Sequence, residues 1–329
     1  MFSLSAECIA RGTATPSAER EDRRNAWLYG VLLVPIMGLV VVVGGVWATA
    51  VCAPFALALA GWFIRRQGNV HRRRRRLWRE PFSGSDFLLR EIPHFALLDA
   101  PGRELFIARA KVFLAETVFH GAGVEVDGEL KLRAAASAII PTLGFPEWDW
   151  RGLREIIFRP EGYEDGSYCA DDGVVTEFEE SGMVGSSGVL SGVMMLSSDD
   201  LIWECAHIEE GVHVGFHEFA HFMAANGMEL AERDRAGWTR LLKREERRFE
   251  DGESLLDDYA LFDGDELFAS ASELFFTIPH RMKEWHRELY WVLSRAYRQD
   301  PCMWIGDYAP QLGKPQKRSR RRRGRRKTR

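Results

Sequence analysis

Residues 211–227 read Gly-Val-His-Val-Gly-Phe-His-Glu-Phe-Ala-His-Phe-Met-Ala-Ala-Asn-Gly, and the rest of the chain is organised around them. His217 and His221 are four residues apart, so a helix places both imidazoles on one face, where they can bind one zinc ion. Glu218 follows His217 and is rotated about 100° around the helix. Its carboxylate can therefore take a proton from water at the metal, and the spacing predicts a zinc site with a general base beside it.

The surroundings of this motif favour a metal site over a chance pair of histidines. Residues 188–197 predict a strand that leads into the helix, and Asn226-Gly227 is a normal helix end. His213 lies four residues before His217 and is an alternative third ligand. Each four-residue step drifts about 40° around a helix, so three such histidines converge poorly on one ion. We expect His213 to pack or to line the cleft.

A third ligand is expected from residues 257–276, because zinc in a catalytic site takes three protein ligands and an open position. Asp263 can cap a helix that runs to about Ile278 and ends before Pro279. Glu266 and Glu273 are two turns apart and share a face of that helix. Spacing alone does not choose between these two glutamates.

These motifs resemble the MtfA-like zinc peptidases and, more distantly, the catalytic domain of anthrax lethal factor. The resemblance covers roughly residues 80–305 and rests on these segments: His-Glu-Phe-Ala-His at 217–221, Ala225-Asn-Gly227, Ala236-Gly-Trp238, Asp258-Tyr-Ala, Glu266-Leu-Phe-Ala and Ser272-Glu-Leu-Phe-Phe276. It implies an α+β fold with a gluzincin-like metallopeptidase domain at residues 81–313, one Zn²⁺ ion, and a peptide or protein substrate.

The resemblance also implies roles for single residues. In that family a tyrosine precedes the ligand glutamate by seven residues, as Tyr259 precedes Glu266. Glu266 is then the third zinc ligand, Tyr259 hydrogen-bonds the developing oxyanion, and Glu273 holds a zinc histidine. Relatives often carry an acidic residue three positions after the second histidine, where this chain has Ala224.

Two functions follow from the resemblance. The first is a zinc metallopeptidase that hydrolyses peptide bonds with Glu218 as its base, and the uncharged stretch 27–64 is expected to anchor it to a membrane. The alternative is a non-catalytic regulator, because the resemblance includes binding to a transcriptional repressor of sugar uptake. Such a protein would sequester the repressor without hydrolysis.

The N-terminal part predicts a membrane anchor. Residues 27–64 carry no charged residue, and one bilayer crossing needs about 20 apolar residues. We therefore expect a transmembrane helical hairpin, with a single span as the alternative. Arg23 and Arg24 precede the stretch, and Arg65, Arg66 and Arg72–Arg76 follow it. By the positive-inside rule we expect the catalytic domain to face the cytoplasm, and we expect the membrane to be a bacterial inner membrane. The run Arg72–Arg76 is a topology signal or a lipid headgroup site.

Charge divides the remaining segments. Residues 314–329 carry 11 Lys and Arg, and residues 1–80 have a net charge of +7, which leaves −22 for 81–313. We expect a polar tail at 1–26, a basic juxtamembrane linker at 65–80 and a disordered basic tail at 314–329. Such a tail can contact nucleic acid, but it lacks interleaved aromatic residues. Five cysteines without a CxxC pair exclude a disulfide framework and fit a reducing compartment.

Short runs predict the elements around the motif. Helices are expected within 81–120, at 130–143, at 237–250 and at 280–297. Strands are expected at 153–158, 174–178 and 188–197, forming one small sheet beside the helix of His217. The edge of that sheet can pair with an extended peptide substrate.

Overall fold

The computed structural model describes part of the chain: residues 54, 57–59, 61, 62, 65, 69, 70, 72–150, 152–160, 167–169, 175–177, 192–226, 228, 230–261 and 263–306. The chain divides into two compact units. The larger consists of Met1–Ser3, Phe82–Phe145 and Trp150–Arg329, and the smaller of Leu4–Pro81 and Pro146–Asp149. The predicted tails at 1–26 and 314–329 lie outside the described residues.

Helices make up most of the described part of the larger unit. They are α3 (Ser85–Glu91), α4 (Pro93–Leu97), α5 (Ala100–Glu116), α6 (Gly128–Ile139), α8 (Ser198–Ala206), α9 (Val214–Ala225), α10 (Glu232–Glu250), α11 (Gly264–Thr277), α12 (Pro279–Trp285) and α13 (Arg287–Tyr297). Short 3-10 helices are η1 (Ile140–Thr142), η2 (Ile208–Glu210), η3 (Tyr259–Leu261) and η4 (Pro301–Met303).

Side-chain caps explain where several helices begin. Asp99 accepts a hydrogen bond from the backbone N–H of Gly102, Asp127 from Leu130, and Ser197 from Asp200, at the starts of α5, α6 and α8. Such caps satisfy backbone donors that have no partner within the helix.

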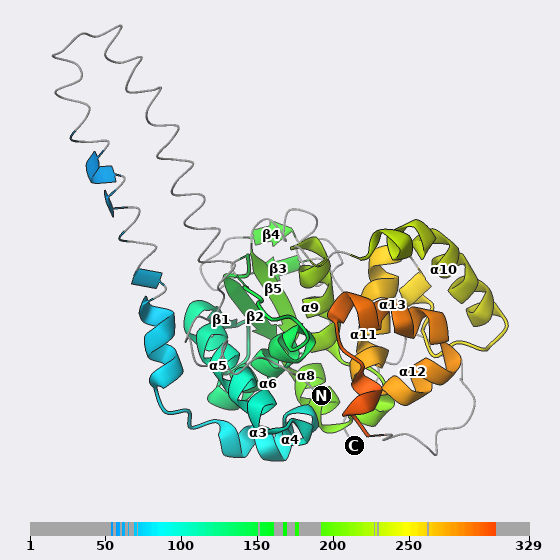
Figure 1. The fold of residues 1–329 in the computed structure, drawn as a ribbon, viewed down its shortest axis with the longest axis horizontal. Coiled ribbons are helices and arrows are strands. Elements are labelled where there is room, and N and C mark those ends of the chain that lie inside the picture. The colour runs from blue at the N-terminus through cyan, green and yellow to red at the C-terminus, as the bar shows by residue number, and fades with distance from the viewer. Residues whose placement is uncertain are drawn as a thin grey trace, which may run out of the picture. The chain divides into compact units, whose positions relative to one another are not determined.

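A three-stranded parallel sheet in the order β1-β2-β5 lies beside these helices (Figure 1). Its strands are β1 (Val118–Gly121), β2 (Glu155–Arg159) and β5 (Val193–Ser197). Alternate residues of β2 and β5 are buried, namely Ile156, Phe158, Met194 and Leu196, which is the pattern of a sheet packed on one face. The chain runs from β5 into α8 and then α9, and β5 also packs against α9.

Two of the three predicted strands pair with each other as expected, and the third lies in another sheet. The runs at 153–158 and 188–197 do contribute paired strands, since Phe158 lies opposite Leu196 in β2 and β5. The run at 174–178 was placed wrongly, because β4 (Val175–Glu177) pairs antiparallel with β3 (Ser167–Cys169) in a separate two-stranded sheet.

Helices α9 and α11 lie side by side within the larger unit (Figure 1). Every residue of α11 from Glu266 to Thr277 is buried, including Phe275 and Phe276. Burying a large apolar side chain contributes about 1.5–3 kcal/mol. This packing brings two segments that are far apart in the sequence into one core.

The predicted fold class was wrong. We expected an α+β, gluzincin-like domain with an N-terminal transmembrane helical hairpin, but the described part of the chain is mostly helical with a small parallel sheet. The strands are only three to five residues long, whereas α5 and α10 have 17 and 19. Periodicity located the strands but could not show how little of the core they build.

The transmembrane hairpin is unsupported. No helix within the described residues combines the length and the apolar character that crossing a membrane requires. Most of the uncharged stretch 27–64 lies outside those residues. The lack of charge is a property of composition, and by itself it does not establish a helix.

Two further local expectations changed. The single helix expected at 280–297 is interrupted at His286, where the backbone leaves helical geometry (φ −126°, ψ 49°) and α12 gives way to α13. In the smaller unit residues 72–79 are helical, and Arg74 is buried with its guanidinium 2.9 and 3.0 Å from the carboxylate of Asp149. One arginine of the basic run therefore has a structural partner.

Candidate metal centre

Buried acceptor groups hold the start of α9. His213 is its N-cap, and its Nδ1 accepts a hydrogen bond from the backbone N–H of Phe216 (3.3 Å). The N–H of Val214 donates to the Glu204 carboxylate of α8, and the N–H of His213 donates to Glu273 of α11 (2.7 Å). Anionic groups at a helix N-terminus are also favoured by its macrodipole. The helix that carries His217 is therefore fixed at its first turn.

Gly215 allows α9 to approach α6 closely. A Cβ atom at this position would lie 2.3 Å from the Ser137 hydroxyl oxygen. No other residue type fits there without a shift of one helix, because real Cβ atoms do not approach so closely.

The two imidazoles of the motif lie close together on α9. The Nε2 atoms of His217 and His221 are 3.2 Å apart. Glu266 reaches them from the first turn of α11, with its Oε2 3.3 Å from His217 Nε2 and its Oε1 3.5 Å from His221 Nε2. The Asp263 carboxylate fixes that turn by accepting hydrogen bonds from the N–H groups of Asp265 and Glu266. One face of α9 and the first turn of α11 thus share a single small site.

These separations fit a tetrahedral zinc ion. Zn–N and Zn–O bonds of about 2.0–2.1 Å at tetrahedral angles place neighbouring ligand atoms about 3.3–3.4 Å apart. The two Nε2 atoms are 3.2 Å apart, one Glu266 oxygen lies 3.3 Å from His217 Nε2 and the other 3.5 Å from His221 Nε2, and one ligand atom from each of the three residues lies within 4.8 Å of the others. Two imidazole nitrogens and a carboxylate oxygen are also a usual ligand set for catalytic zinc. The residues present therefore fit the ion.

Glu273 holds the imidazole of His217 from the opposite side. Its Oε1 lies 2.7 Å from His217 Nδ1. A carboxylate only accepts hydrogen bonds, so Nδ1 carries the proton and Nε2 is the nitrogen available to a metal ion. Its other oxygen accepts from the backbone N–H of His213, so one carboxylate fixes both the imidazole and the helix start.

The electrostatics of the site favour a cation. Burial lowers the pKa of His217, but the carboxylates of Glu266 and Glu273 more than offset this and raise it to about 10. Burial favours the neutral form of Glu266, yet hydrogen bonds from His217 and His221 bring the pKa of that carboxyl well below its usual range. The carboxylates of Glu266 and Glu273 therefore stabilise a positive charge in the buried site, and a divalent ion can supply that charge.

The other predicted site residues are placed as follows. Glu218 follows His217 on α9 and is buried, with 8 % of its surface exposed. Tyr259 begins η3, which packs against α11, but its side chain lies outside the described residues. Ala224 is exposed near the end of α9. The roles assigned to Glu218 and Tyr259 stay predictions.

His213 is not among the residues that surround the site. It caps α9, and its Nε2 lies 3.5 Å from the Cys205 sulfur. Burial, reinforced by nearby His94, lowers the pKa of His213 to about 3 against the opposing effect of Glu273. It is therefore a neutral packing residue.

Sequence reasoning missed Glu204. It stands in the short helix α8 and carries one of the three acceptors at the start of α9. The available signal was an acidic residue flanked by Trp203 and Cys205 on an amphipathic helix, where a carboxylate needs a buried donor.

A histidine pair on a helix, with a glutamate from a later helix beside it, is the arrangement of zinc-dependent metallopeptidases. The chain belongs to the glucose-regulated metallo-peptidase M90 family, whose model matches residues 69–298. The resemblance to MtfA-like peptidases is thereby confirmed. Membership implies a bound metal ion, typically zinc.

The chain also matches most of the length of relatives from Salmonella and Synechocystis. Mlc titration factor A of Salmonella arizonae is 28% identical over 232 residues, which cover 64% of this chain and 88% of the relative. The protein of the same name from Salmonella paratyphi B is 28% identical over 245 residues, or 66% and 89%. Uncharacterized protein slr2042 of Synechocystis is 27% identical over 225 residues, or 64% and 82%.

Proposed function

We propose that the protein is a zinc-dependent metallopeptidase that hydrolyses peptide bonds in a peptide or protein substrate. The observation that carries the proposal is the convergence of the Nε2 atoms of His217 and His221, 3.2 Å apart, with the Glu266 carboxylate, one oxygen of which lies 3.3 Å from His217 Nε2 and the other 3.5 Å from His221 Nε2. Family membership supports the same chemistry. When bound, zinc would polarise the carbonyl of the scissile bond and lower the pKa of water toward about 7.

The chain's own residues perform the remaining tasks. His217, His221 and Glu266 hold the ion, and Glu273 keeps the proton of His217 on Nδ1. Glu218 accepts the proton of the attacking water and then passes it to the leaving amine. The Tyr259 hydroxyl donates a hydrogen bond to the oxyanion of the tetrahedral intermediate.

The zinc content of purified variants tests whether Glu266 or Glu273 is the zinc ligand. Full-length wild type and the variants Glu266→Ala and Glu273→Ala are purified and analysed for zinc. We expect one zinc ion per wild-type chain, loss of the ion in Glu266→Ala, and retention with weaker affinity in Glu273→Ala. Loss in Glu273→Ala alone would reverse the assignment of the two glutamates.

Hydrolysis is tested with Glu218→Gln on a quenched fluorescent peptide library. The amide cannot act as a base, so we expect zinc content to stay at the wild-type level while cleavage falls by at least about 100-fold. Unchanged cleavage by this variant, or no cleavage by zinc-loaded wild type, would refute the enzymatic proposal.

A second candidate function is sequestration of a transcriptional repressor without hydrolysis. The name of the Salmonella relatives, Mlc titration factor A, favours it. Purified Mlc is the probe, and its affinity for wild type, for Glu218→Gln and for chelator-treated protein is measured. Binding that survives both treatments supports a regulator, and no binding to any of the three forms refutes it.

We also propose that residues 81–313 lie in the cytoplasm. Cys205 and Cys302 are free thiols, which fits a reducing compartment. A C-terminal green fluorescent protein fusion expressed in bacteria should fluoresce if the domain stays inside. A dark fusion, together with an active periplasmic phosphatase fusion at the same site, would place it outside.

A further inference from the structure

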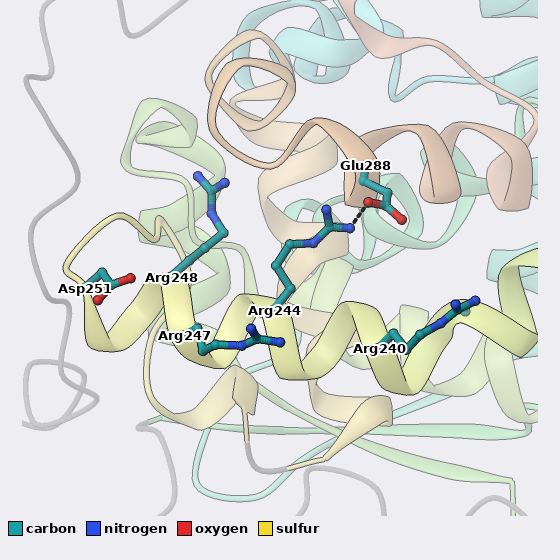
Figure 2. A pocket seen from close by; sticks show the side chains of 7 residues that line it. Arg240, Arg244, Arg247, Arg248, Asp251 and Glu288 are labelled. Atoms are coloured by element: carbon teal, nitrogen blue, oxygen red, sulfur yellow. Dashed lines mark ion pairs between the residues drawn. The ribbon is translucent and has the colours of Figure 1, made fainter.

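A hollow lined by arginines runs along α10, and none of the residues of the metal centre lines it (Figure 2). Its volume is about 580 Å³, and its lining includes Arg240, Arg244, Arg247, Arg248, Asp251 and Glu288. Glu288 comes from α13, and the four arginines come from a single helix. We call this feature the α10 arginine groove.

The arginines share one face of the helix. Their positions, 240, 244, 247 and 248, follow the spacing that places side chains next to one another. Like charges at this spacing repel one another and weaken a helix. A nearby anion removes this cost, so the face is suited to a negatively charged ligand.

Internal carboxylates satisfy only part of this charge. Glu288 pairs with Arg244, and Glu245 lies 3.7 Å from Arg248. Within the described residues, no carboxylate forms an ion pair with Arg240 or Arg247, and both are exposed. Arg247 Nε donates a hydrogen bond to the carbonyl of Lys243 (3.2 Å), so the two terminal nitrogens of Arg247 and the guanidinium of Arg240 remain available to a ligand.

The length of the groove indicates what kind of anion fits. Eight residues of helix separate Arg240 from Arg248, which corresponds to about 12 Å at 1.5 Å per residue. A single phosphate ion would reach one end of this span, whereas about four extended peptide residues match it at about 3.3 Å each. Guanidinium groups bind carboxylates through paired hydrogen bonds, and Glu288 already supplies such a carboxylate within the groove.

The net charge of residues 81–313 disfavours a long polyanion. It is −22, so a nucleic acid that extends over this part of the chain beyond α10 would meet net repulsion. A short acidic segment makes its contacts inside the groove. We propose that the α10 arginine groove binds an acidic segment of a protein partner, with at least two carboxylates in about four extended residues.

The groove adjoins the helix that carries Glu266. Gly237 lines the groove, and its neighbour Trp238 donates a hydrogen bond to the carbonyl of Gly264, the first residue of α11 (3.2 Å). A partner held in the groove would thus sit on an element that packs directly against α11. Binding in the groove itself needs no metal ion, so its test is independent of the proposed hydrolysis.

Arginine reactivity, mapped residue by residue, tests the proposal on the full chain. The protein is labelled with p-hydroxyphenylglyoxal, with and without hexaglutamate, and each arginine is quantified by mass spectrometry. We expect hexaglutamate to protect Arg240 and Arg247, while Arg233 on the same helix stays reactive. Hexaglutamine should protect none of them. Mapping each site separates the groove from the basic residues at 314–329.

Two matched pairs of variants sharpen the test. Glu288→Gln frees Arg244 and should lower the hexaglutamate concentration for half-protection of Arg240 about two- to fivefold, whereas Glu284→Gln, an exposed change of equal charge outside the groove, should not. Arg240→Gln should raise the concentration for half-protection of Arg247 by a similar factor, and Arg233→Gln should not.

Three results would overturn the proposal. The first is equal protection of Arg233 and the groove arginines. The second is the same response to both members of either matched pair, in proteins whose melting temperatures match wild type. The third is protection of Arg240 and Arg247 by a 12-nucleotide single strand at lower concentration than by hexaglutamate, which would assign the groove to nucleic acid. If an arginine variant fails to fold, the proposal is tested by comparing the protection of Arg240 in Glu288→Gln and in Glu284→Gln.

Discussion

At the scale of single residues, Glu273 joins two functions in one carboxylate. One oxygen accepts from His217 Nδ1 and the other from the backbone N–H of His213. In Glu273→Gln an amide nitrogen replaces one of the two oxygens. This nitrogen cannot accept a hydrogen bond, so one of the two contacts is lost whichever way the amide is oriented. We expect zinc affinity to fall about 10- to 100-fold, measured by competition with a chelating indicator. Glu232→Gln, an exposed change on α10, is the control and should leave the affinity unchanged.

A second residue-scale prediction concerns the buried hydroxyl pair of Ser272 and Tyr297. Ser272 donates to the carbonyl of Phe268, and its oxygen lies 2.8 Å from the Tyr297 hydroxyl. Burial raises the pKa of Tyr297, so the hydroxyl stays protonated. Ser272→Ala removes its partner and should lower the free energy of unfolding by about 1–3 kcal/mol, measured with urea.

The double variant provides the check on this pair. Tyr297→Phe removes the hydroxyl that Ser272→Ala leaves without a partner. The double variant should therefore lose less free energy of unfolding than the sum of the losses in the two single variants. Additive losses would show that the two hydroxyls do not stabilise each other.

At the scale of elements, the start of α9 depends on α8. The Glu204 carboxylate accepts from the N–H of Val214 in a buried setting. Glu204→Ala leaves that donor unsatisfied and should lower the free energy of unfolding by about 1–3 kcal/mol. Glu204→Gln keeps an acceptor oxygen but loses the charge at the helix N-terminus, so its loss should be smaller, at about 1 kcal/mol or less.

The measurement is chemical unfolding of the metal-free protein, so that zinc binding does not contribute. Asp199→Asn, on the first turn of α8, is a comparison with the same loss of charge. Equal losses for Glu204→Ala and Asp199→Asn would contradict a specific cap.

At the scale of the whole molecule, buried histidines make stability depend on pH. His94 on α4 is buried beside Phe216 of α9, and its Nε2 lies 2.6 Å from the carbonyl oxygen of Phe276 in α11. Burial lowers the pKa of His94 to about 4, against the opposing effect of that hydrogen bond. The folded protein therefore keeps this histidine neutral at pH values where the unfolded chain protonates it.

The sign of the effect follows from the protons bound. Between pH 6.5 and about 4 the unfolded chain binds more protons than the folded one, so the free energy of unfolding falls as the pH falls. His94 contributes up to about 3 kcal/mol to this fall. His94→Gln should flatten the curve in this window, measured by urea unfolding at several pH values. An unchanged slope would contradict the prediction. His120→Gln, a change at an exposed histidine, is the control.

Local sequence determined the parts of this protein that depend on a few neighbouring residues. The spacing of His217 and His221 places both imidazoles on one helical face, and Asp263 caps α11 as expected. Helix periodicity and capping act over a single turn, so they can be read from the sequence. The two candidate glutamates were also found this way, although their spacing left both open and only the family resemblance singled out Glu266.

Only the tertiary structure decided how these parts meet. It placed Glu266 beside the Nε2 atoms and Glu273 beside Nδ1 of His217, a contact between residues 56 positions apart. It also put β4 in a separate sheet, ended α12 at Trp285, and made helices rather than strands the bulk of the described core. Such outcomes depend on which distant surfaces bury each other. The free energy of that packing is shared among many contacts, and no short stretch of sequence contains it.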